Sequence, residues 1–204
     1  MAKIAAVFPG IGYHTDKPLL YYSKKIALKQ GYEIVNLTYT DLPHGIKGNA
    51  EKMREAGLLA LKQVKEQLDP LNLASCEDVL FLSKSIGTAV AQAYAKERGI
   101  AARQVLYTPV EQTFEFVEEN PAGIAFCGTK DQWADTKKVM AKCREKGLPL
   151  YVTEGANHSL ETEDPCRTSK TSTSSCSIRT TTSQRTGETP LTSDSIGREQ
   201  GEHT

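Results

Sequence analysis

The sequence predicts an α/β fold in which helices cover both faces of a mostly parallel sheet. Short apolar runs that are rich in β-branched residues alternate with longer stretches of helical period. This alternation is typical of parallel strands joined by helices. Several of the short runs are apolar throughout, which indicates interior strands covered on both faces.

Six short apolar segments are predicted strands: in chain order, residues 3–8, 32–37, 79–82, 104–107, 123–127 and 150–153. Between them, two stretches repeat apolar or small residues at three- and four-residue steps, which predicts amphipathic helices. The repeating residues are Met53, Gly57, Ala60, Val64 and Leu68 in one stretch, and Trp133, Thr136, Met140 and Cys143 in the other. A third helix is predicted from about residue 86 to 98, where Gly and Ala recur and allow close packing against a sheet.

The composition of the chain excludes two classes of partner. Its 204 residues balance 25 Lys and Arg against 25 Asp and Glu. A nucleic-acid backbone or an anionic membrane would need an excess of basic side chains. The first apolar run, residues 4–8, is too short for a signal peptide, and no run approaches the roughly 18 residues that span a bilayer. We therefore expect a cytoplasmic protein that binds neither nucleic acid nor membrane, and we leave its oligomeric state open.

The chain divides at about residue 165. Residues 1–164 carry nearly all of the apolar side chains and are predicted to form one domain. Residues 165–204 form a low-complexity tail that is rich in Ser and Thr, has no aromatic side chain and is predicted to be disordered. A further hypothesis is a frameshift near Pro165, because codons permitted for residues 166–177 encode a helix-like segment in the offset frame. The nucleotide sequence would test it.

The sharpest local motif is a polar turn between the strand at residues 79–82 and the small-residue helix that follows. Ser85 lies at the centre of this turn, Ser83 precedes it by two positions and Gly87 follows it by two. One interpretation is that Ser85 only caps the helix, which is a common role for serine at a helix start.

The same turn resembles the nucleophile elbow of α/β-hydrolases, whose pattern is G-x-S-x-G. Gly87 matches the second glycine of that pattern, and Ser83 stands in place of the first. The resemblance extends over residues 3 to about 162, and two stretches, residues 108–113 and 156–161, resemble a group of small, single-domain, lidless bacterial α/β-hydrolases. It implies an α/β-hydrolase-like sheet with Ser85 as the nucleophile.

That family places its catalytic residues in the chain order Ser, acid, His, each after a strand. Here the strand at residues 123–127 runs into Asp131, and the strand at residues 150–153 runs into His158. The resemblance therefore implies the set Ser85, Asp131 and His158. The alternatives are that Asp131 caps a helix beginning near residue 133 and that His158 is an ordinary surface residue.

Two other acids remain candidates for the partner of the histidine. Asp135 follows Asp131 closely in the chain, and Glu111 comes soon after the strand that ends at Tyr107. Each would lie near the carboxyl edge of a parallel sheet, as the family's acid does.

The loop after the first strand, residues 9–13, resembles the family's His-Gly-x-Gly stretch, with proline in the histidine position. The resemblance implies that the backbone N–H groups of Ile11 or Gly12, and of Ile86, bind the oxyanion. A rival interpretation is a dinucleotide-binding loop at Gly10 and Gly12. It fits less well, because Thr15 stands where the third glycine belongs and the second strand ends without an acid.

The resemblance implies a serine hydrolase that cleaves an ester or a thioester through an acyl-enzyme. Its partner would be a small-molecule acyl substrate, with no cofactor and no metal. Only a short segment joins the strands that end at Tyr107 and begin at Gly123, so an open site without a lid is expected. The alternative from another class is a non-catalytic α/β binding module, either dinucleotide-binding or an inactive hydrolase relative.

Overall fold

The structure is a computed structural model, and it describes residues 2–164 and 168. The predictions about the tail at residues 165–204, namely its disorder and its origin in a frameshift, lie outside the described residues apart from Thr168. That residues 1–164 form one domain remains a prediction.

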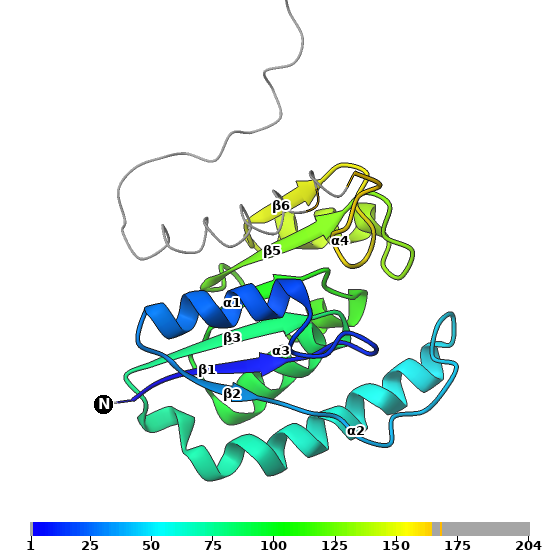
Figure 1. The fold of residues 1–204 in the computed structure, drawn as a ribbon. Coiled ribbons are helices and arrows are strands. Elements are labelled where there is room, and N and C mark those ends of the chain that lie inside the picture. Colours follow the sequence, from blue (N-terminus) through cyan, green and yellow to red (C-terminus); the bar gives the residue numbers. More distant parts are fainter. Residues whose placement is uncertain (1, 165–167, 169–204) are drawn as a thin grey trace, which may run out of the picture.

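A parallel sheet of six strands is the centre of the fold (Figure 1). Its strands are β1 (Lys3–Phe8), β2 (Glu33–Asn36), β3 (Asp78–Lys84), β4 (Arg103–Tyr107), β5 (Gly123–Gly128) and β6 (Leu150–Thr153), in the order β2-β1-β3-β4-β5-β6. The six strands are those that the sequence predicts, with bounds that differ by at most two residues. Strand β2 lies on one side of β1, and β3 lies on the other, so the direction of the strand order reverses at β1. Such a reversal opens a crevice at the carboxyl edge of the sheet.

Helices cover both faces of the sheet, as predicted. They are α1 (Pro18–Lys29), α2 (Ala50–Leu68), α3 (Ile86–Arg98) and α4 (Thr136–Glu145). Helix α1 packs on one face, where Leu19 and Leu20 join a core cluster with side chains of β3, β4 and β5. Helices α2 and α3 pack on the other face against β1 and β3, and α4 packs there against β5.

Helix α1 was not predicted, and its composition explains why. Its buried face includes Ser23 and Lys24 beside the apolar residues, so the apolar period is interrupted. The helix also begins without a side-chain cap at Lys17. The available signal was Pro18 in the first turn, a position that proline favours.

Helix α4 begins at Thr136, three residues later than the predicted period suggests. Asp135 is its N-cap and accepts hydrogen bonds from the N–H groups of Lys137 and Lys138. The buried side chains of the helix are Val139 and Cys143, whereas Trp133 lies before the helix and is 40% exposed. Met140, within the helix, is exposed as well, so the prediction that Trp133 and Met140 lie on the apolar face of this helix is wrong.

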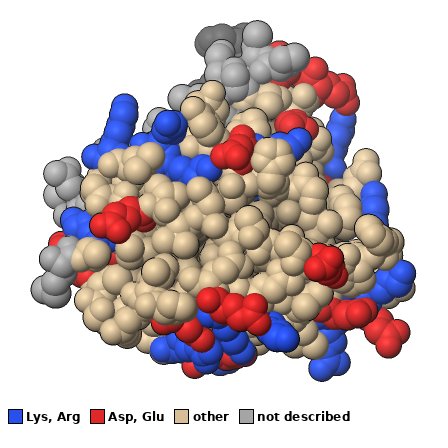
Figure 2. Space-filling view, turned by 60° about the horizontal axis from the view of Figure 1, so that its bottom comes forward, with Lys and Arg blue, Asp and Glu red and all other residues tan. Residues whose placement is uncertain are grey.

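The surface carries no block of one charge on the face seen from the side of α2 (Figure 2). Lys and Arg alternate there with Asp and Glu around the rim, and uncharged side chains occupy the middle. Among the residues that the structure describes, no helix has both the length and the apolar composition needed to cross a membrane.

Replacement of glycine by alanine should have opposite effects on stability at two positions. A Cβ at Gly87 would lie 2.4 Å from the Pro9 carbonyl oxygen and 2.6 Å from that of Phe8, whereas a Cβ at Gly57, within α2, would meet nothing. We expect Gly87→Ala to lower the free energy of unfolding by about 1–3 kcal/mol through overpacking. Gly57→Ala should raise it by roughly 0.5–1 kcal/mol. Urea unfolding of both variants is the test, and equal effects would contradict the close approach at Gly87.

Candidate active site

Three side chains from three loops meet at the carboxyl edge of the sheet. Ser85 follows β3, Asp131 follows β5 and His158 follows β6. The Oγ of Ser85 lies 2.8 Å from Nε2 of His158. The Nδ1 of His158 lies 2.7 Å from Oδ2 and 2.9 Å from Oδ1 of Asp131. The structure therefore brings together the three residues that the resemblance implies.

Ser85 lies in the turn between β3 and α3 with φ 55° and ψ −126°. A non-glycine residue with positive φ is uncommon, so the turn is strained. Ser85 occupies the N-cap position of α3, but its side chain makes no capping hydrogen bond and instead contacts His158. Of the two interpretations of Ser85, the structure favours the elbow over the cap.

The elbow is built from close backbone approaches. A side chain at Gly87 would collide with the backbone after β1, and Gly10 lies against Ser85, where an added Cβ would be 3.1 Å from the serine Cβ. Ser83, which replaces the first glycine of the motif, is fully buried, and its hydroxyl donates to the Val105 carbonyl on β4 at 3.0 Å. The serine is therefore accommodated without an unpaired buried hydroxyl.

Asp131 is held as a carboxylate. Its side chain is 1% exposed, and Oδ1 accepts the N–H groups of Trp133 and Ala134 in addition to the imidazole. Burial acts to raise the pKa of Asp131, but the hydrogen bonds and the charge of His158 outweigh it and hold this pKa below its usual range. The carboxylate can thus orient the imidazole through Nδ1.

His158 lies in a loop that Asn157 organises, because Oδ1 of Asn157 accepts the N–H groups of Ser159 and Glu161. The imidazole stacks on the indole of Trp133 with ring centroids 5.8 Å apart. Burial lowers the pKa of His158 below its usual value, the hydrogen bond to Asp131 opposes that shift, and the charge of Lys84 adds to it. At neutral pH the imidazole is therefore neutral, and Nε2 can accept a proton.

The two alternative acids are engaged elsewhere. Asp135 caps α4, and Glu111 pairs with Lys138 at 3.3 Å. Within the described part of the chain, neither makes a hydrogen bond or an ion pair with His158.

The backbone donors named from the sequence line a cavity of about 130 Å³ beside Ser85 and His158. Gly10 and Tyr13 close the first loop by exchanging backbone hydrogen bonds of 3.0 and 3.1 Å. Across residues 2–164 and 168, no acceptor takes a hydrogen bond from the N–H of Ile11, Gly12 or Ile86. Among the described residues these three N–H groups therefore have no partner, and the residues that carry them line the cavity.

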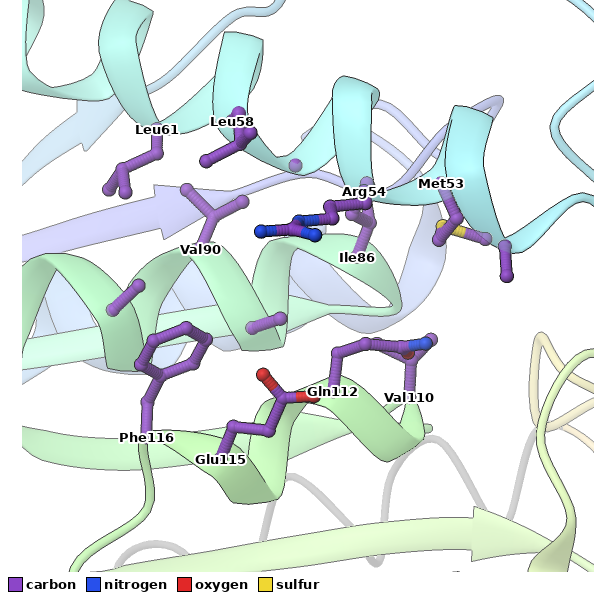
Figure 3. Close-up of a pocket in the computed structure, with 14 residues that line it drawn as sticks. Met53, Arg54, Leu58, Leu61, Ile86, Val90, Val110, Gln112, Glu115 and Phe116 are labelled. Atoms are coloured by element: carbon purple, nitrogen blue, oxygen red, sulfur yellow. The ribbon is translucent and has the colours of Figure 1, made fainter.

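A larger groove of about 560 Å³ adjoins this cavity, and Met53 and Ile86 line both. Its walls are α2, α3 and the segment after β4, and most of its side chains are apolar (Figure 3). Polar groups line it as well: Figure 3 labels Arg54 on α2 and Glu115 in the short 3₁₀ helix Glu111–Glu115. That helix stands in the short connection between β4 and β5, where no lid was expected.

No family model matches the sequence, and no curated protein matches it. Solved structures match most of the chain. An alpha-beta serine hydrolase homologue from Coxiella burnetii has a TM-score of 0.62 and 16% identity over 87% of this chain and 84% of that chain. Est1E from Butyrivibrio proteoclasticus, solved with ferulic acid bound, has a TM-score of 0.64 and 11% identity over 88% of each chain. A Bacillus cereus carboxylesterase has a TM-score of 0.56 and 12% identity over 85% of this chain and 87% of that chain.

This chain has the α/β-hydrolase fold. The resemblance inferred from the sequence is thereby confirmed for the fold.

Sequence reasoning missed five residues that line the small cavity, among them Tyr13 and Ser159 in loops that it had singled out. Of the other three, Lys84 precedes the elbow serine, Trp133 stacks on the imidazole, and Met53 extends from α2. A lysine at the end of an apolar strand was the available signal for Lys84. As for metals, the described residues include no group of three His, Cys, Asp or Glu side chains that could hold an ion.

Proposed function

We propose that this protein is a serine hydrolase that cleaves a carboxylic ester or thioester through an acyl-enzyme. The observation that supports this most directly is the continuous hydrogen-bond chain from Ser85 through His158 to Asp131. A neutral imidazole 2.8 Å from a serine hydroxyl and oriented by a buried carboxylate is what activates a serine nucleophile.

In the proposed reaction, Ser85 Oγ attacks the acyl carbonyl carbon while its proton passes to Nε2 of His158. The tetrahedral intermediate collapses, the bond to the leaving oxygen or sulfur breaks, and the leaving group takes the proton from His158. Water then attacks the acyl-enzyme and gives a proton to the same nitrogen. Collapse of the second intermediate releases the acid and returns that proton to Ser85.

The negative charge that develops on the carbonyl oxygen needs donors placed before the reaction begins. The N–H groups of Ile11 or Gly12 and of Ile86 would supply them, because they line the cavity beside Ser85. Asp131 would stabilise the imidazolium that forms after proton transfer.

The two connected spaces suggest a two-part substrate. The cavity of about 130 Å³ would hold the smaller part, and the apolar groove of about 560 Å³ would hold a larger apolar part. The scissile bond would then lie at Ser85 in the small cavity, close to Met53 and Ile86, which line both spaces.

The second candidate is the non-catalytic binding module, and its dinucleotide form fits poorly. Residues 9–17 separate β1 from α1, and the first residue of α1 is Pro18, which has no N–H for a phosphate. A fluorophosphonate probe tests catalysis directly. We expect labelling of the folded wild-type protein but not of Ser85→Ala or of the heat-denatured protein, and an unlabelled wild type would favour the binding module.

The pH dependence of the reaction should follow His158. Only the neutral imidazole accepts the Ser85 proton, so kcat/KM should rise as pH rises through the pKa of His158 and then level off. Because burial lowers this pKa, we expect the midpoint below the usual value of about 6.5. Initial rates with p-nitrophenyl acetate from pH 5 to 8 test this, and a flat profile would argue against a histidine base.

A further inference from the structure

Lys84 is a buried cation at the edge of the candidate active site. Its side chain is 1% exposed, yet it lines the same small cavity as Ser85 and His158. Its Cγ lies against Gly10, and its ammonium lies 5.1 Å from the centre of the Tyr13 ring. Lys84 therefore runs beneath the loop that carries the expected oxyanion donors.

No carboxylate of the described residues neutralises this ammonium by an ion pair, and no oxygen among them accepts a hydrogen bond from it. The two acids that influence it are engaged elsewhere: Asp131 with His158, and Glu161, which is exposed, with Asn157. Burial lowers the pKa of Lys84 to about 7, although the charges of Asp131 and Glu161 act to raise it. The third titratable group nearby is His158, whose pKa the charge of Lys84 lowers and which is neutral at that pH.

A protonated lysine in this position is unfavourable without an anionic partner. Burying an ammonium without an anionic partner costs more free energy than burying an apolar side chain of the same size. The cation–π contact with Tyr13 offsets only part of that cost. An anion in the cavity would supply the missing partner.

We propose that the small cavity binds an acyl group that ends in a carboxylate, with Lys84 as its counter-charge. This inference rests on the proposed hydrolase function and names its substrate class: monoesters or monothioesters of short dicarboxylic acids. Size limits the acyl group to a short one, since about 130 Å³ holds roughly four or five non-hydrogen atoms if each takes the volume of about one water molecule, and a succinyl group has about five beyond its ester carbonyl. The apolar alcohol or thiol part would lie in the larger groove.

The test compares two esters of one shape. Monobenzyl succinate and benzyl 4-methylpentanoate differ only in that a carboxylate replaces an isopropyl group. At pH 6.5 we expect the wild type to have at least about a tenfold higher kcat/KM for the succinate ester, as a charge-assisted hydrogen bond provides. In Lys84→Met, which keeps the length of the side chain, this ratio should fall to about one.

Lys47→Met is the matched control. Lys47 is exposed, and its ammonium lies 5.4 Å from the centre of the ring of Trp133, which lines the small cavity. If nearby positive charge alone attracted the anion, this variant would lose the preference equally, and that result would overturn the role of Lys84. The wild-type ratio should also fall as pH rises through about 7, where Lys84 loses its proton, while that of Lys84→Met should not.

A binding measurement separates this inference from the proposed function. Trp133 is the only tryptophan of the sequence and lines the cavity, so its fluorescence reports occupancy. In Ser85→Ala, monomethyl succinate should change the fluorescence, and adding Lys84→Met should weaken its binding at least about tenfold. If the wild type hydrolysed both esters at equal rates, the proposed preference for an anionic acyl group would be wrong and the proposed hydrolase function would stand. Binding of the succinate ester through Lys84 without turnover of either ester would reject the hydrolase function.

Discussion

Replacing Ser85 by alanine is expected to abolish turnover of a short ester while leaving the fold intact. The change removes the nucleophile and opens no cavity, and alanine meets the same backbone strain as serine at φ 55°. Losses of about 10⁴-fold or more in kcat are usual for members of a Ser-His-Asp set. Steady-state hydrolysis of p-nitrophenyl acetate measures the loss, and the far-UV circular dichroism spectrum checks the fold.

Ser83→Ala is the control for this prediction. It removes a buried hydroxyl two residues away and breaks the hydrogen bond to the Val105 carbonyl, which should lower stability by about 1 kcal/mol. Its activity should stay within about tenfold of the wild type, since the change is two residues from the nucleophile and removes a bond to β4 only. Activity retained by Ser85→Ala with an unchanged spectrum would exclude Ser85 as the nucleophile.

Asp131→Asn should be nearly as damaging, with a loss of about 10⁴-fold in kcat. An asparagine oxygen can still accept the N–H groups of Trp133 and Ala134, so the turn is kept. The amide NH₂ would then donate to Nδ1 of His158, and this leaves the proton on Nε2, where Ser85 needs an acceptor. The same ester assay measures the loss.

The alternative acids provide matched variants for that assay. Asp135→Asn keeps a good helix cap, and Glu111→Gln removes only an exposed ion pair with Lys138. Both should retain activity within a few fold. If either lost more activity than Asp131→Asn, the assignment of the acid would be wrong.

The position of the site could be predicted because its signals are local. Each of the three residues follows an apolar strand, and parallel strands bring their carboxyl ends to one edge of the sheet. The elbow could be recognised from Gly87, since only a residue without a side chain fits against the backbone after β1. The chain order of the three residues then selected His158 from the four histidines.

Other features depend on packing that the sequence does not display. The charged and hydroxyl side chains of α1 conceal its buried face. Lys24 pairs with Asp16 in the loop before the helix, and Ser23 meets the Tyr107 hydroxyl on β4 once the helix has docked. The groove exists only because α2, α3 and the segment after β4 meet. The burial of Lys84 is likewise set by its neighbours, because a lysine in a sequence ordinarily indicates a solvated side chain.

The positive φ of Ser85 has a consequence for how stability is distributed in the molecule. Three residues other than Asn, Asp or Gly share this backbone region: Ser85, Thr108 at the end of β4 and Leu160 in the loop after β6. All three are buried and lie at the carboxyl edge, and each such conformation costs about 1–3 kcal/mol. Apart from glycines, the described residues at the opposite edge of the sheet with positive φ are Asn72 and Asn120, and asparagine tolerates this conformation. The free energy of local opening should therefore be lower at the carboxyl edge than at the opposite edge. Backbone amides at the carboxyl edge should exchange with solvent faster.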